Sequence, residues 1–209
     1  MKKMMMMLLL ASGAFYAPAQ NDNLKNNDEI RTIFSKDRKN GGYGAFSFAY
    51  GKINGKDAFI SGGRGMFIFD HLFGVGFGGY GFFNDIHHYH NMNGSPAKNS
   101  LTGGYGGVVF EPIIGGKLPV HLAFPILIGV GGVAINENDW WDDVPFDESS
   151  SDTYFVFEPT AELEFNLVKF IRASATLSYR FTSEIGLPQI DPDAIEGLTV
   201  GLTLKLGKF

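Results

Sequence analysis

Residues 162–180 read "ELEFNLVKFIRASATLSYR", and apolar and polar side chains alternate along both halves of this stretch. The apolar positions are Leu163, Phe165, Ile171, Ala173, Ala175, Leu177 and Tyr179. The positions between them hold Glu162, Glu164, Arg172, Ser174, Thr176, Ser178 and Arg180. A period of two residues is that of a β-strand, whose successive side chains point to opposite faces. The stretch therefore predicts a β-hairpin, turning at 166–169, with one apolar face and one charged face.

The same alternation extends over the chain after residue 40. We expect eight strands, at 41–53, 57–69, 72–83, 101–114, 118–135, 153–166, 170–182 and 197–209. Tight turns are expected at 70–71, 115–117 and 166–169. The other connections are polar, at 54–56 (itself short), 84–100, 136–152 and 183–196. Alternating strands joined by short turns at one end and longer loops at the other predict an all-β fold, an eight-stranded antiparallel up-and-down transmembrane β-barrel.

Two other folds share part of this pattern. A soluble β-sandwich also alternates, and a lipocalin-like barrel places its apolar face inside. Here the polar face is largely Gly, Ser and Thr with few charges, unlike a soluble surface strand. The uncharged segment 118–135 approaches the length of a spanning helix. Pro119, Pro125 and many β-branched residues disfavour a helix there, so the segment is predicted to be a long strand.

The N-terminus has the layout of a secretory signal peptide. Lys2 and Lys3 precede an apolar run from Met4, which ends in small residues at Ala17 and Ala19. We therefore predict a signal peptide at 1–19, a periplasmic lead-in at 20–40 and a barrel domain at 41–209. An exported barrel belongs in the cell outer membrane. An even number of strands places the N-terminus and the C-terminus of the barrel domain on the periplasmic side.

Composition excludes several kinds of site. The 209 residues include 28 Gly and 20 Phe but no Cys, and the net charge is −5. Abundant Gly and aromatic residues without a strict period favour β-structure. The lack of Cys excludes a disulfide framework, a Cys-based zinc site and a lipid anchor on Cys. No basic patch indicates a nucleic-acid partner.

Four stretches carry a family resemblance. They read "GGYGAFSFAYG", "GVGFGGYGFF", "LTGGYGGVVFEPII" and "EGLTVGLTLKLGKF". Over 41–209 the chain resembles small outer-membrane β-barrel proteins of the OmpA type, particularly those of Bacteroidetes. The resemblance implies that the barrel-assembly machinery reads the last strand, with Phe209 as the assembly signal. Phe209 is out of phase with Leu202, Leu204 and Leu206, and a bulge near Gly207 would bring them onto one face.

Eight charged side chains are expected to point into the lumen. They are Arg64, Glu111, Glu158, Glu162, Glu164, Arg172, Arg180 and Lys205. Side chains nearly fill the interior of an eight-stranded barrel, and buried ions must be paired. We expect a salt-bridged interior, with Glu164 near Arg172 across the hairpin. A narrow path for ions or a site for a polar solute is the alternative. Acid–base catalysis by Glu162 and Glu164 is not favoured, because no substrate cleft is recognisable around them.

The remaining candidate sites are less specific. Gly74, Gly76 and Gly79 have dinucleotide-motif spacing, but no helix is expected after them, so close packing of the barrel is favoured. His87, His88 and His90 are weak candidates for a metal site in the 84–100 loop. The 136–152 loop, rich in Asp and Glu, is either a solvated rim or a weak Ca²⁺ or Mg²⁺ site. Trp140 and Trp141 lie in the same loop, either at the membrane interface or in a binding patch.

These observations predict a monomeric outer-membrane protein with a structural or surface-interaction role. Its expected partners are outer-membrane lipid and, during biogenesis, the barrel-assembly machinery. No enzyme activity and no cofactor are predicted. The alternatives are a narrow pore and an enzyme that modifies membrane lipid, and the latter needs a nucleophile with a base in reach. Such a pair cannot be assembled from the sequence.

Overall fold

The computed structural model of the protein describes residues 40–90, 96–137, 151–187 and 190–209, with the side chains of 85–90, 96–100 and 136–137 excepted. These ranges contain nine strands. They are β1 (Gly41–Ile53), β2 (Lys56–Phe69), β3 (Phe73–His90), β4 (Pro96–Ile114), β5 (Val120–Ala123), β6 (Ile126–Glu137), β7 (Ser151–Val168), β8 (Ile171–Thr182) and β9 (Gly197–Lys208). In this part of the chain, no helix is long and apolar enough to cross a membrane.

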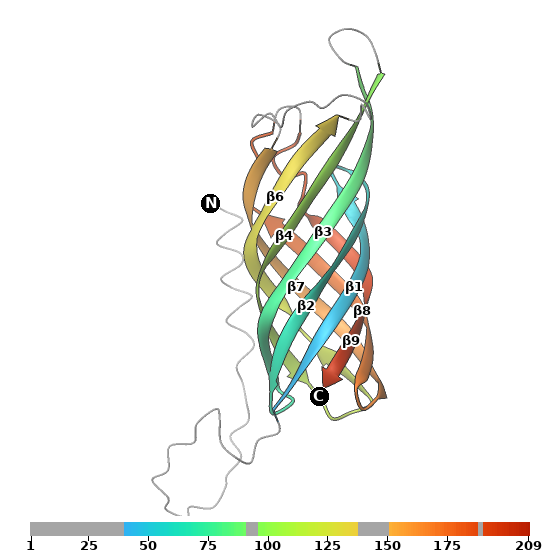
Figure 1. The fold of residues 1–209 in the computed structure, drawn as a ribbon, viewed down its shortest axis with the longest axis vertical. Helices are drawn as coiled ribbons and strands as arrows, with labels where there is room; N and C mark the ends of the chain where they lie inside the picture. Colours follow the sequence, from blue (N-terminus) through green and yellow to red (C-terminus); the bar gives the residue numbers. More distant parts are fainter. Residues whose placement is uncertain (1–39, 91–95, 138–150, 188–189) are drawn as a thin grey trace, which may run out of the picture. The chain divides into compact units, whose positions relative to one another are not determined.

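The strands form a closed antiparallel ring (Figure 1). Strands that follow one another in the sequence pair with each other, except β5 with β6, and β1 closes the ring by pairing with β9 from Gly42–Lys208 to Gly51–Thr199. Strands β5 and β6 both lie between β4 and β7, so together they occupy one position. The ring therefore has eight positions, and the predicted eight-stranded barrel is confirmed.

The predicted strand 118–135 is interrupted at Phe124 and Pro125. Proline has no N–H to donate to a ladder, which explains a break at this point. Backbone hydrogen bonds connect the two residues of this interruption to the neighbouring strands β4 and β7. The Phe124 N–H donates to the Pro112 carbonyl at 2.9 Å, and the Thr160 N–H donates to the Pro125 carbonyl at 2.8 Å. The chain thus keeps its course across the ring despite the split.

The loop predicted at 84–100 is wrong in extent. Strand β3 continues to His90 and β4 begins at Pro96, with an irregularity between Ile86 and Tyr89. The barrel already fixes the register between β3 and β4. Further residue pairs can therefore form beyond the barrel without an additional entropic cost of loop closure. The outer β3–β4 hairpin is therefore much longer than the alternation of apolar residues suggested.

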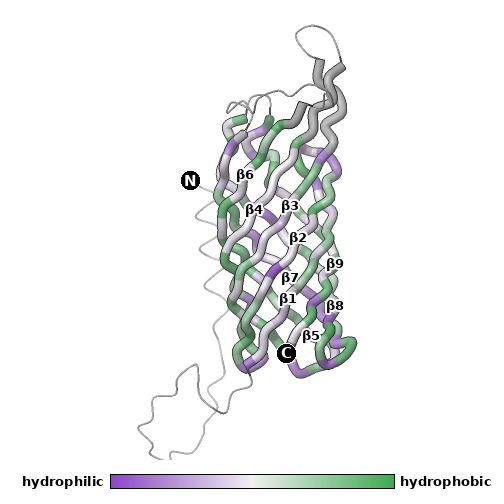
Figure 2. The backbone as a smooth tube through the Cα atoms, in the orientation of Figure 1, coloured by the Kyte–Doolittle hydropathy of each residue, from purple (hydrophilic) through white to green (hydrophobic). Residues whose placement is uncertain are grey.

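Hydrophobic and hydrophilic residues alternate along the strands (Figure 2). The charged residues of the strand interiors are largely buried, whereas many large hydrophobic side chains are exposed on the outside of the ring. Large hydrophobic side chains are exposed around the whole ring, up to 73% for Phe155. Other examples are Phe46, Phe67, Phe77, Val130, Leu177, Leu202 and Leu204. A continuous apolar surface of this kind is unstable in water and matches the hydrocarbon of a bilayer.

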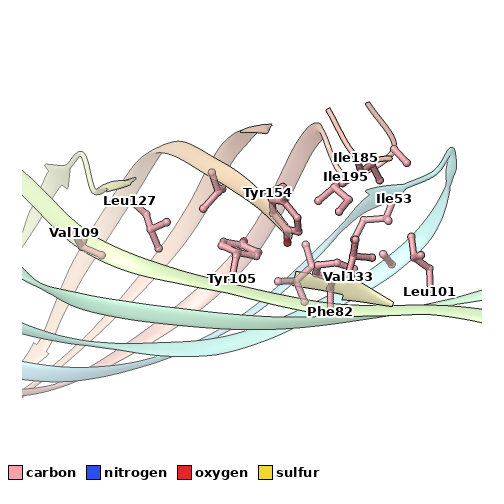
Figure 3. Packing of buried hydrophobic residues seen from close by; sticks show 14 of the residues in the cluster. Ile53, Phe82, Leu101, Tyr105, Val109, Leu127, Val133, Tyr154, Ile185 and Ile195 are labelled. Carbon is pink, nitrogen blue, oxygen red and sulfur yellow. The ribbon is translucent and has the colours of Figure 1, made fainter. Parts of the chain in front are cut away.

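The described parts of the predicted loop 183–196, residues 183–187 and 190–196, fold into the outer mouth of the barrel instead of projecting from it. Their side chains Ile185, Leu187, Ala194 and Ile195 are buried. They belong to an apolar cluster with inward-facing side chains of the strands (Figure 3). The strand members include Ile53, Phe82, Leu101, Val133, Tyr154 and Val156. We call this set the outer apolar plug; its burial was not predicted from the polar composition of 183–196.

The β1–β2 hairpin turns at Asn54 and Gly55, whose φ angles are 51° and 71°. Two positive φ angles characterise a type I′ turn, which favours Asn-Gly. Gly55→Ala is expected to lower the free energy of unfolding by about 1–2 kcal/mol, because a Cβ disfavours this backbone conformation. Urea titration of the protein in lipid vesicles measures the change. Asn54→Gly, which permits the same turn, should change it by less than about 0.5 kcal/mol; equal losses for the two variants would contradict the backbone explanation.

Candidate functional site

All eight charged residues expected in the lumen have buried side chains, with at most 8% of the residue exposed. The inward positions of β2, β4, β7, β8 and β9 supply them. They are Arg64, Glu111, Glu158, Glu162, Glu164, Arg172, Arg180 and Lys205. The structure divides them into two groups with different partners.

Lys205 lies at the centre of the larger group. Its Nζ is 2.8 Å from a carboxylate oxygen of Glu162 and 3.3 Å from one of Glu111, and it also contacts the Glu164 carboxylate. Arg64 reaches Glu162 from the opposite side, with its Nη2 2.8 and 2.7 Å from the two carboxylate oxygens. One ammonium thus contacts three carboxylates, which come from the two strands β4 and β7.

A tyrosine completes the centre of this group. The Tyr43 hydroxyl donates to Glu111 and accepts a hydrogen bond from Arg64 Nε at 3.1 Å. Arg64 Nη2 also lies 3.4 Å from Glu111. The tyrosine hydroxyl thus adds a hydrogen bond to a carboxylate that Arg64 and Lys205 also contact, and a buried ion cluster requires such additional hydrogen bonds.

The larger group continues toward the end of the barrel that carries the β2–β3, β4–β5 and β7–β8 turns. Glu164 lies 2.8 Å from His121 Nε2 and 3.3 Å from Arg172 Nη1. Arg172 also donates to the Gly116 carbonyl at 3.4 Å, and its guanidinium lies 3.9 Å from the centre of the Phe209 ring. The strand pairing places Glu164 and Arg172 in adjacent rows of the β7–β8 hairpin, in contact as expected.

The smaller group consists of Glu158 and Arg180. Ser178 donates to Glu158 at 2.7 Å. Arg180 donates to the Tyr105 hydroxyl at 3.1 Å and to the Ile195 carbonyl at 2.9 Å. Arg180 is therefore tied to the outer apolar plug, whereas the larger group lies toward the other end.

A cavity of about 30 Å³ separates the two groups. Its walls include Arg64 and Glu162 of the larger group, Glu158 of the smaller group, and several hydroxyl side chains. The hydroxyl residues are Ser47, Tyr80, Tyr105, Thr160, Thr176, Ser178, Thr199 and Thr203. Among the described residues, Glu158 Oε2 and Thr199 Oγ1 have no hydrogen-bond partner. The space is suited to one or a few water molecules, not to a hydrated ion or a solute.

His121 and Tyr43 belong to the site but were absent from the predicted set. The alternation itself could have identified both. His121 stands between exposed Val120 and Leu122, so it must point inward; Tyr43 precedes Phe46 and Phe48 with inward parity. Neither residue carries a fixed charge, so neither belonged to the predicted set of charged lumen residues.

Phe209 does not share the apolar outer face. The β1–β9 ladder runs without a register shift, so it has no bulge near Gly207 that would bring Phe209 onto the face of Leu202, Leu204 and Leu206. The Phe209 ring instead lies on the inner side, 5.5 Å from the Tyr43 ring and against Arg172. Because the ladder is regular, Phe209 keeps the alternation of the strand and lies on the face opposite Leu202, Leu204 and Leu206. The Arg172 guanidinium contacts the ring there. Its role as an assembly signal remains a prediction.

The predicted metal site and most of the acidic loop lie outside the described residues. The structure does not describe the side chains of His87, His88 and His90, nor residues 138–150 of the acidic loop with Trp140 and Trp141. Asp152 accepts hydrogen bonds from the backbone N–H groups of Thr153 at 2.7 Å and Gly186 at 2.6 Å. Within the described ranges, no group of three or more His, Asp or Glu residues could hold a metal ion.

Two chemical alternatives gain no support from the geometry. The segment with Gly74, Gly76 and Gly79 continues as strand β3, whereas a dinucleotide motif requires a helix. Lipid modification requires a base beside a nucleophile. The contacts of His121 are to the Glu164 carboxylate and the Arg172 guanidinium, neither of which is the serine that such chemistry uses.

Comparison with known proteins gives a likeness in structure alone. No protein-family model and no curated protein matches the chain. Neisserial surface protein A (NspA) superposes with a TM-score of 0.53 at 8% identity, over 83% of this chain and 100% of that chain. Ail of Yersinia pestis gives 0.45 at 14% identity (81% and 99%), and the N-terminal barrel domain of Pseudomonas aeruginosa OprF gives 0.42 at 15% (80% and 96%). With its closed ring of eight positions and its apolar outer face, the chain has the fold of the small outer-membrane β-barrel proteins.

Proposed function

We propose that this protein is a closed outer-membrane barrel with a structural or surface-interaction role, and that it does not conduct solutes. The observation that carries the proposal is the filling of the lumen along its length. Phe209 and Arg172 lie toward the end with the short turns. Lys205 and the carboxylates of the larger group occupy the middle, and the outer apolar plug fills the opposite end.

Electrostatics supports a closed interior. The larger group contains three carboxylates and three fixed cations, so its formal charges balance without a mobile ion. An ion that entered would have to displace a buried partner, and breaking a buried pair costs about 3–5 kcal/mol. The cavity of about 30 Å³ between the groups offers no hydrated route around them.

The outer rim is the surface left for interaction. Within the described residues it carries exposed carboxylates at Asp57, Glu184 and Asp191. The long β3–β4 hairpin extends the same end of the barrel (Figure 1). A barrel with a sealed interior and a charged outer rim supports a role in contacts outside the cell, which we prefer to transport.

Conductance tests this proposal. The folded protein inserted in planar lipid bilayers is expected to give no discrete current steps at any applied voltage, because the cavity between the two charged groups is only about 30 Å³, too small for a hydrated ion. Insertion is verified by co-flotation with lipid vesicles and by the heat-dependent change in gel mobility typical of such barrels. Reproducible unit currents that scale with the number of inserted barrels would contradict the closed lumen and favour the pore.

A further inference from the structure

Three exposed lysines lie along one side of the rim formed by the short turns. Lys117 is in the β4–β5 turn, Lys169 is in the β7–β8 turn, and Lys208 ends β9. Hydrogen bonds join these segments in order. Asn166 Nδ2 donates to the Leu118 carbonyl at 2.6 Å, and the Gly207 N–H donates to the Phe170 carbonyl at 3.0 Å. We call Lys117, Lys169 and Lys208 the basic arc.

The charge of this rim is one-sided. The remaining short turn, between β2 and β3, contains Asp70, His71 and Leu72 but no lysine. The opposite rim carries exposed carboxylates, including Asp57 and Glu184. The basic arc is therefore a local cationic patch on a chain whose net charge is −5.

The turns that carry the lysines are also apolar at their surface. Leu118 is 57% exposed, Leu167 59% and Phe170 61%. Side chains of this kind at the tips of short turns require hydrocarbon around them, so the turns lie at the boundary of the membrane and do not project into water. A lysine placed there lays its stem along the apolar surface and extends its ammonium to the level of the lipid headgroups.

We propose that the basic arc binds the phosphate groups of anionic phospholipids in the leaflet that faces the short turns. Charge complementarity selects an anion, and the apolar neighbours select an anion attached to acyl chains. A soluble acidic protein would match the lysines but would leave Leu118 and Phe170 uncovered. The arc would thus fix the depth and the tilt of the barrel by attaching one side of its rim to headgroups.

Lipid binding to a matched pair of variants tests this proposal. The full chain, purified in uncharged detergent, is titrated with phosphatidylglycerol or phosphatidylcholine, and bound lipid is counted by native mass spectrometry. K117Q/K169Q removes two lysines of the arc. K52Q/K56Q removes two lysines at the opposite rim and is the control for the same change in net charge.

We expect wild type to retain phosphatidylglycerol in preference to phosphatidylcholine. K117Q/K169Q should reduce the affinity for phosphatidylglycerol at least fivefold, since juxtamembrane lysines attract anionic headgroups. K52Q/K56Q should stay within about twofold of wild type, and 0.5 M salt should remove most of the preference because it screens exposed charge. Equal losses in the two variants, or no loss in K117Q/K169Q, would overturn the proposal. Neither outcome depends on whether the lumen conducts.

Discussion

Lys205→Met is expected to lower the free energy of unfolding by about 3–5 kcal/mol, the cost of leaving a buried charge without its partner. Lys205 is fully buried and contacts Glu111, Glu162 and Glu164. Methionine has a similar length but no charge, so three carboxylates would lose their common cation while the packing volume is retained. Arg64 would still hold Glu162, and Arg172 would still hold Glu164.

Urea titration in lipid vesicles, followed by gel mobility, measures this loss. Lys52→Met is the matched control, because Lys52 is exposed and its replacement should change stability by less than about 1 kcal/mol. The double variant K205M/E162Q should be more stable than K205M, since it leaves two carboxylates with two arginines and so restores the charge balance of the group. A loss below about 1 kcal/mol for Lys205→Met would show that the carboxylates do not depend on the ammonium.

The second large effect is expected from a single methyl group. Gly76 lies on β3 opposite Met66 of β2. A Cβ at Gly76 would overlap the carbonyl oxygen of Gly65 and come within 2.6 Å of the Met66 sulfur. The sulfur can move, but the carbonyl belongs to the β2–β3 backbone and cannot move without disturbing the ladder. Gly76→Ala is therefore expected to cost about 2–3 kcal/mol, in the upper range of overpacking.

Gly65→Ala provides the control on the neighbouring strand. A Cβ at Gly65 meets nothing within 4 Å. Its replacement should leave the free energy of unfolding within about 0.5–1 kcal/mol of wild type or raise it, because alanine restricts the unfolded chain more than glycine does. The same urea titration compares the two variants. Similar losses at both positions would show that backbone flexibility matters here, not close approach of the strands.

Much of the fold could be predicted because a strand repeats every two residues. In 170–182 the alternation assigned Leu177 and Tyr179 to the outer face and Arg180 to the interior, and the barrel places them there. The extent of the outer β3–β4 hairpin could not be predicted in the same way. The β3–β4 pairing continues beyond the residues that clearly alternate. The local sequence pattern therefore does not indicate where the pairing ends.

The arrangement inside the lumen was less accessible to sequence reasoning. Parity predicts that Arg64 and Glu162 both point inward, but not that they meet. Their contact joins β2 to β7 across the ring, and it depends on the stagger of the strands, which no local pattern records. The same stagger separates Glu158 and Arg180 from the other charges and places Tyr105 beside Arg180. A balanced count of acids and bases therefore could not reveal two groups.

The pairing of β1 with β9 has a consequence for the order of events in folding. The ring closes only when the C-terminal strand joins the N-terminal one, and β9 is the strand that carries Lys205. Until then Glu111, Glu162 and Glu164 lack the ammonium that they share, so an unclosed sheet of β1–β8 has excess negative charge along its inner face. The last strand therefore supplies the missing positive charge along the same seam that closes the wall of the barrel.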